Sequence, residues 1–171
     1  MHHTTAVTLY ATDYPLLGSK MDLILWRHAD AVDGEPDLSR ELTPKGHQQA
    51  KKMAEWLKQR IPNSTRILVS PAARAQQTAA ALQRKYQTIN ALSPNADAMT
   101  LLLTAGWPDG GSTVLLIGHQ PSLGQAAMLL LSGQEAELSI KKGGIIWISN
   151  RVRKATQQQH ILRAALSSEM I

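Results

Sequence analysis

The sequence predicts a three-layer α/β sandwich with a largely parallel central sheet. Three short apolar runs of buried-strand type occur along the 171-residue chain, at residues 22–26, 66–70 and 113–117. A segment with helical periodicity follows each run, so that strands and helices alternate. Strands that are apolar throughout are typical of parallel sheets with both faces covered, and alternating helices provide that cover.

The first helix has the clearest local signals. We expect Thr43 to cap it and Pro44 to occupy its first position, because a threonine oxygen accepts a backbone hydrogen bond there and proline needs no such partner. We expect the chain at 62–63, Pro-Asn, to end it. Apolar residues recur between these limits with the spacing of one buried helical face: Ala50, Met53, Ala54, Leu57 and Ile61.

The remaining elements follow from the same reasoning. A second helix is expected to open at Pro71 and a third strand to span residues 89–92. The predicted buried face of the second helix is Ala75, Thr78, Ala79, Leu82 and Tyr86. The other predicted elements are helices over 98–103 and 121–131, the latter stopped by Ser132–Gly133, and strands over 145–149 and 160–166.

Residues 1–20 are expected to form a mobile extension, because the strong pattern begins only at Met21. Residues 21–171 are expected to form a single domain. No apolar run is long enough for a membrane span, and the first twenty residues lack the pattern of a secretory signal. The chain has no cysteine. We therefore expect a cytoplasmic protein that does not contact a membrane.

The charge balance points to an anionic ligand. The formal net charge is +5, which suits either nucleic acid or an anionic substrate. Nucleic-acid platforms combine basic with aromatic side chains, whereas this chain has four tryptophans, three tyrosines and no phenylalanine. We expect no nucleic-acid partner.

Polar side chains directly follow three of the predicted strands. Arg27 and His28 follow the first strand, the segment from Ser70 to Arg74 follows the second, and Gly118–His119 follows the strand at 113–117. In open α/β sheets, ligands bind beyond the carboxyl ends of the strands. Three strand ends therefore direct two arginines and two histidines to one crevice.

This set of side chains suits a phosphoryl group. Arg27 and Arg74 can each hold two phosphoryl oxygens in fork geometry. His28 can attack phosphorus if its nitrogen is unprotonated, and nearby arginines favour that state by lowering its pKa. His119 is expected to donate to the phosphoryl oxygens. No acidic cluster has metal-ligand spacing, so we expect neither a metal nor a cofactor.

These segments resemble the motifs of the histidine phosphatase superfamily, whose fold is that of the phosphoglycerate mutases. The compact length and the segment 38–43 are most similar to the SixA-type branch. Ala29 stands where the superfamily often has glycine, and residues 1–20 lie outside the pattern. The matching segments keep the same order over residues 21–166 and are Leu25–Ala29 with Asp30, Leu42–Gly46, Val69–Thr78 and Ile117–Pro121.

The resemblance implies a metal-independent phosphatase that carries a phosphohistidine on His28. It implies Arg27, Arg74 and His119 as catalytic partners that bind the phosphoryl group, and it suggests Arg40 as a further phosphate or substrate contact. For the SixA-type branch, the implied substrate is a phosphohistidine on a phosphorelay or carrier protein, with phosphate as product.

The sequence offers no convincing proton donor for a leaving group. Residues 87–112 contain only Asp97 and Asp109, both in turn-like contexts, while Asp30 and Glu41 stay open as acids. An alkyl ester needs such a donor, whereas imidazole leaves from a phosphoramidate with little help. This difference favours protein phosphohistidine as substrate. Two alternatives remain: a small-molecule phosphomonoesterase on the same fold, and a non-catalytic module that binds phosphate or phosphoprotein.

Overall fold

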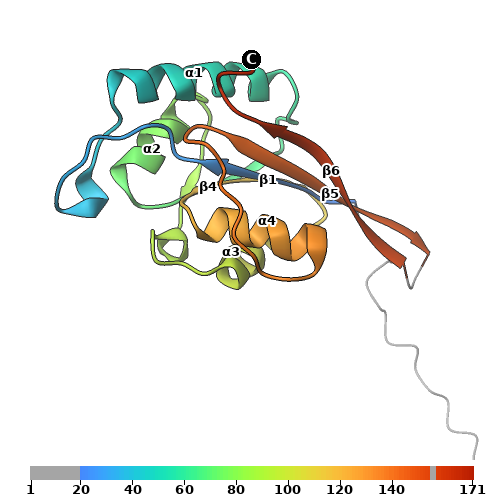
Figure 1. Cartoon of the computed structure of the whole chain (residues 1–171). Helices are drawn as coiled ribbons and strands as arrows, with labels where there is room; N and C mark the ends of the chain where they lie inside the picture. The colour runs from blue at the N-terminus through green and yellow to red at the C-terminus, as the bar shows by residue number, and fades with distance from the viewer. Residues whose placement is uncertain (1–19, 155–156) are drawn as a thin grey trace, which may run out of the picture.

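The computed structural model describes residues 20–154 and 157–171. Within these residues a six-stranded sheet lies between two layers of helices (Figure 1), which confirms the predicted three-layer sandwich. The predicted extension over residues 1–20 lies outside the described residues, except for Lys20. None of the helices in the described part of the chain is long and apolar enough to cross a membrane.

The sheet combines a parallel part with an antiparallel edge. Its order is β3-β2-β4-β1-β5-β6. The pairs β1–β4, β2–β4 and β2–β3 are parallel, while β1–β5 and β5–β6 are antiparallel. The prediction of a largely parallel sheet is therefore confirmed. The strands are β1 (Asp22–Arg27), β2 (Arg66–Val69), β3 (Gln87–Thr88), β4 (Thr113–Gly118), β5 (Ile145–Lys154) and β6 (Gln157–Leu166).

Two helices cover each face of the sheet. The helices are α1 (Pro44–Lys58), α2 (Ala73–Ala80), α3 (Ala98–Ala105) and α4 (Ser122–Ser132), with two short 3-10 helices, η1 (Asp37–Ser39) and η2 (Asn90–Leu92). Helices α1 and α2 lie on one face, and α3 and α4 lie on the other (Figure 1). Each pair closes its own apolar core.

Strand β1 contributes to both cores. Leu23 and Leu25 pack in the core under α3 and α4, whereas Ile24 and Trp26 pack in the core under α1 and α2. All four side chains are fully buried. Successive side chains of a strand point to opposite faces, so a strand buried on both faces reads as one unbroken apolar run.

Helix α1 begins as predicted. The Thr43 hydroxyl oxygen accepts a hydrogen bond from the Gly46 amide at 2.9 Å, and Pro44 is the first helical residue. The predicted apolar face is buried throughout. The helix ends at Lys58 rather than at the predicted limit, and Ile61 is buried from the turn that follows.

Other predicted bounds also differ from the structure, and β5 and β6 are longer than the predicted strands over 145–149 and 160–166. Residues 89–92 do not form a strand, because the third strand is Gln87–Thr88 and the next residues form η2. A short apolar run alone cannot distinguish these outcomes. Helix α2 begins two residues after Pro71 and ends at Ala80, so Leu82 and Tyr86 lie beyond it. Gln83 then takes a left-handed φ of 53°, which a continuing helix does not allow.

Candidate active site

The strand ends bring the predicted residues together. Arg27 ends β1 and pairs with Gly118 at the end of parallel β4, so His28 and His119 leave the sheet side by side. Their ring centroids are 5.1 Å apart. Arg74, in the first turn of α2, places its Nε 3.3 Å from Nε2 of His28. Burial leaves His28 8% exposed, Arg74 4% and His119 3%.

The backbone fixes the orientation of the His28 ring. Its Nδ1 lies 2.8 Å from the Ala29 carbonyl oxygen, a contact that requires the proton on Nδ1. Nε2 is then unprotonated and accepts the Arg74 hydrogen bond. Burial lowers the pKa of His28 to about 4, against the opposing effect of the Ala29 hydrogen bond, and the charges of Arg74, Arg27 and Lys142 lower it further. The attacking nitrogen of His28 is therefore unprotonated at neutral pH.

The lowered pKa of His28 predicts a fold that weakens in acid. The unfolded chain binds a proton on this ring below about pH 6.5, whereas the folded chain binds it only near pH 4, so stability falls as the pH drops through that window. Between pH 7 and 4.5, wild type should lose about 2–3 kcal/mol more unfolding free energy than His28→Asn. Denaturant titrations at both pH values measure this difference. Equal losses in the two proteins would contradict the buried neutral ring.

His119 is held by a buried serine whose role the sequence did not reveal. Nε2 of His119 lies 2.7 Å from Oγ of Ser70, and that oxygen also accepts the Ala72 amide at 3.2 Å. Burial lowers the pKa of His119 to about 3, and the nearby His28 ring and Arg74 guanidinium act in the same direction, since a proton on His119 would face them. Within the described residues Nδ1 of His119 is buried and has no partner. A neutral ring that accepts from Ser70 presents Nδ1–H as a free donor.

Ser70→Ala is expected to change the tautomer of His119 and to reduce kcat about tenfold, the usual effect of losing one such hydrogen bond. The ring ¹⁵N chemical shifts report the tautomer directly. Ser122→Ala is the matched control, because this buried hydroxyl donates to the His119 carbonyl at 3.2 Å and does not touch the ring. Unchanged ring shifts in Ser70→Ala would contradict this role.

The loop between β1 and α1 is fastened at both ends. Ala31 and Leu42 form an isolated antiparallel bridge, and the Thr43 amide donates to the Asp30 carbonyl at 3.0 Å. A side chain on Gly46 would meet that same carbonyl oxygen at 1.9 Å, so only glycine lets α1 approach it. These contacts hold the two ends of the loop together, close to His28 in the chain.

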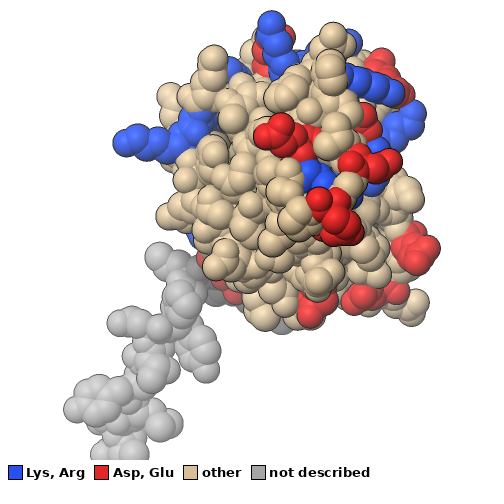
Figure 2. Space-filling view, turned by 90° about the vertical axis from the view of Figure 1, so that its left-hand side faces the viewer, with Lys and Arg blue, Asp and Glu red and all other residues tan. Residues whose placement is uncertain are grey.

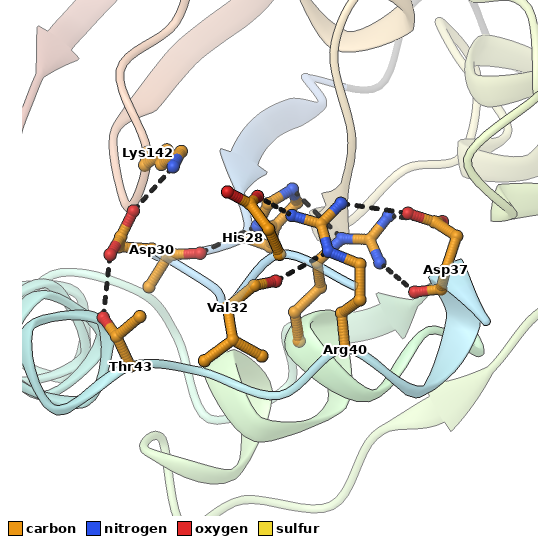
Figure 3. Close-up of polar contacts among 10 residues, drawn as sticks. His28, Asp30, Val32, Asp37, Arg40, Thr43 and Lys142 are labelled. Carbon is orange, nitrogen blue, oxygen red and sulfur yellow. Dashed lines mark hydrogen bonds and ion pairs between the residues drawn. The ribbon is translucent and has the colours of Figure 1, made fainter. Parts of the chain in front are cut away.

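The Asp30 side chain also helps to hold the two ends of this loop together. Its carboxylate accepts from the Thr43 hydroxyl at 2.8 Å and pairs with Nζ of Lys142 at 2.6 Å (Figure 3). The hydrogen bonds from Lys142 and Thr43 lower the pKa of Asp30. An ionised carboxylate committed to these partners is a poor proton donor. Glu41, the other acid left open by the sequence, is exposed on the same loop.

Asp37 reaches into the cluster, although sequence reasoning gave it no role. Its Oδ2 lies 2.9 Å from Nη2 of Arg74, and its carbonyl accepts from Nη1 of the same guanidinium at 2.7 Å (Figure 3). The hydrogen bonds from Arg74 and then Arg40 lower the pKa of Asp37. Nothing in the sequence separates this aspartate from Asp33 in the same polar loop.

Arg40 binds the loop rather than the histidines in this structure. Nε donates to the Val32 carbonyl at 2.7 Å, Nη1 lies 3.0 Å from Oδ1 of Asp37, and Nη2 lies 3.2 Å from Oδ1 of Asp33 (Figure 3). Its connection to Arg74 runs through Asp37. The phosphate contact assigned to Arg40 stays a prediction.

Arg27 lies at the edge of the cluster. Its Nη1 donates to the Ile140 carbonyl at 2.6 Å, and its Nε is buried without a partner among the described residues. It lines a cavity of about 310 Å³ together with Gln120 and Glu137.

The described part of the chain contains no group of three or more His, Cys, Asp or Glu side chains that could hold a metal ion. The two neutral imidazoles and the Arg74 guanidinium lie together, with Arg27 at their edge, and such a set of groups can stabilise and accept a phosphoryl group.

The chain is similar to several known proteins. The model of the histidine phosphatase superfamily (branch 1) matches residues 23–95. The phosphohistidine phosphatase SixA of Escherichia coli is 32% identical over 123 residues, which cover 67% of this chain and 76% of the relative. An uncharacterized protein of Picosynechococcus sp. is 37% identical over 139 residues, covering 74% of this chain and 83% of the relative. The structure of the protein histidine phosphatase SixA complexed with tungstate has a TM-score of 0.69 at 25% identity, covering 88% of this chain and 99% of that one.

Proposed function

Because the chain belongs to the histidine phosphatase superfamily and to its SixA-type branch, we propose that this phosphatase removes phosphate from protein phosphohistidine through a phosphohistidine on His28. The observation that carries the proposal is the state of the His28 ring. Its Nδ1 is committed to the Ala29 carbonyl, and its Nε2 faces Arg74 as an unprotonated acceptor.

The reaction proceeds in two displacements. In the first, Nε2 of His28 bonds to phosphorus while the bond from phosphorus to the substrate imidazole breaks. Arg27 and Arg74 hold the phosphoryl oxygens, and Nδ1–H of His119 donates to them. In the second, water attacks the phosphohistidine, both of its protons stay with the phosphate product, and Nε2 is free again. Nδ1 of His28 keeps its proton and its contact with Ala29 throughout.

The carboxylates near the site favour a phosphoramidate substrate. Asp30 and Asp37 both have lowered pKa values, because Lys142 and Arg74 respectively stabilise their ionised forms. Asp97 caps α3, where its carboxylate accepts the Thr100 amide at 2.7 Å. None of these three supports proton donation to an alkoxide. Phosphohistidine needs no donor when the departing imidazole already carries a proton on its other nitrogen.

A phosphate-release assay with phosphohistidine proteins tests the proposal. Phosphorylated phosphorelay domains and phosphocarrier proteins are the substrates, and the assay contains EDTA throughout. We expect catalytic release of inorganic phosphate that the chelator leaves unchanged. No release from any of these proteins would refute the substrate class, and activity lost with EDTA and restored by a divalent ion would refute the metal-independent mechanism.

A further inference from the structure

The guanidinium donors of Arg74, the fork that would hold a phosphoryl group, already have hydrogen-bond partners in this structure. Nη1 and Nη2 donate to the carbonyl and carboxylate of Asp37, and Nε donates to His28. With only 4% of its surface exposed, Arg74 has little room for a further partner. The arginine expected to hold two phosphoryl oxygens thus holds two oxygens of one aspartate instead.

A carboxylate and a phosphoryl group cannot occupy this fork together. Both bind guanidinium through the same charge-assisted hydrogen bonds, so they compete for the same donors. They also repel each other as like charges. A phosphoryl group that bonds to both Nη atoms of Arg74 must therefore displace Asp37.

The segment that carries Asp37 can leave without disrupting a core. Residues 32–39 are exposed except for Asp37, which is half-buried, and η1 contains no buried residue. The three hydrogen bonds of Arg40 all end within this segment, at Val32, Asp33 and Asp37, so they hold it together as one unit. The bridge between Ala31 and Leu42 marks its two ends.

The surface around this segment also carries negative charge. Acidic side chains gather close to basic ones on the face where η1 lies (Figure 2). Asp33 and Glu35 are both exposed there. Asp33 has the same charge as Asp37 but pairs only with Arg40, so the two aspartates allow direct competition to be separated from general repulsion.

Resting on the phosphatase function proposed above, we propose that Asp37 is an internal competitor for the phosphoryl group. In the free enzyme Asp37 fills the Arg74 fork. When phosphate binds, its contacts with Arg74 break, segment 32–40 moves outward, and the phosphoryl oxygens take both Nη atoms. Arg40 keeps its bonds to Val32, Asp33 and Asp37 and moves with the segment. The competition weakens the binding of inorganic phosphate.

Two measurements with inorganic phosphate test this role in the full-length protein. The first is calorimetric affinity. Asp37→Asn should bind phosphate about tenfold more tightly than wild type, the effect of removing one charged hydrogen bond from the competing state. Asp33→Asn should stay within about threefold of wild type, since screened surface charges contribute little.

The second measurement follows the movement of the segment. The chain has no cysteine, so a fluorescent thiol label attaches only where a cysteine is introduced. Leu38→Cys places the label in η1 at a residue that is 51% exposed, and Met99→Cys on α3, 53% exposed, is the matched control. Phosphate should change the emission of the label at position 38 saturably and leave the label at position 99 unchanged.

The possible failures are distinguishable. The competitor role is overturned if phosphate saturates the protein without changing the emission of the label at position 38. It is also overturned if Asp37→Asn and Asp33→Asn bind phosphate with equal affinity. In both cases the proposed function stands. If neither wild type nor Asp37→Asn binds phosphate, the competitor role fails, whereas the proposed function fails only if the enzyme also releases no phosphate from phosphohistidine proteins.

Discussion

Turnover is expected to fall by about 10⁴-fold or more when His28 is replaced by alanine, because the variant lacks the nitrogen that accepts the phosphoryl group. The measurement is the rate of phosphate release from a phosphohistidine protein. The fold should persist, since Arg74 keeps its two contacts with Asp37 and the strand before position 28 is unchanged. Circular dichroism of the variant checks this.

The control for this variant is a histidine of the same chain that lies away from the cluster. His47 is exposed on α1, so His47→Ala removes an imidazole without touching the site. It should keep wild-type activity. Near-normal turnover by folded His28→Ala would exclude His28 as the nucleophile.

The second large effect is a dependence of rate on the leaving group. A well-placed general acid raises the reaction rate about 10²–10⁴-fold, and it does so only when the departing atom is a strong base. In the proposed mechanism two arginines and two histidines serve the phosphoryl group, while Lys142 and Arg74 lower the pKa values of Asp30 and Asp37. We expect ready hydrolysis of phosphohistidine, weaker hydrolysis of p-nitrophenyl phosphate, and very slow hydrolysis of sugar or glycerol phosphates.

This dependence is measured as kcat/KM at fixed pH across leaving groups of rising pKa. A flat profile would mean that a general acid acts in the site. Glu137 would then be the first residue to replace, since it lines the cavity beside Arg27, followed by Glu41. A preference for one sugar phosphate over phosphohistidine would favour the phosphomonoesterase alternative.

Those features of the fold that depend on local signals could be predicted from the sequence. Thr43 and Pro44 mark the start of α1 by capping chemistry that needs no tertiary contact. Strand β1 is apolar from Leu23 to Trp26, and these four side chains are buried on the two faces of the sheet. The errors include residues 89–92 and the ends of α1 and α2, where packing against the rest of the chain decides between a turn and a regular element.

The same distinction applies to the candidate site. Each of the four predicted residues lies at a strand end or in the first turn of the helix after one, so the order of elements alone places them at one edge of the sheet: Arg27, His28, Arg74 and His119. Asp37 lies in an irregular loop whose course depends on the Arg40 contacts, and no periodicity describes such a loop.

The most direct test of the central claim is a rapid-quench experiment with a radiolabelled phosphohistidine protein. The reaction is stopped in base at successive times, and the label on the enzyme is measured after separation from the substrate. We predict that wild type carries a base-stable, acid-labile phosphate that maps to His28 and that His28→Ala carries none. Wild-type enzyme that turns over while remaining unlabelled at every quench time would contradict the covalent phosphohistidine intermediate.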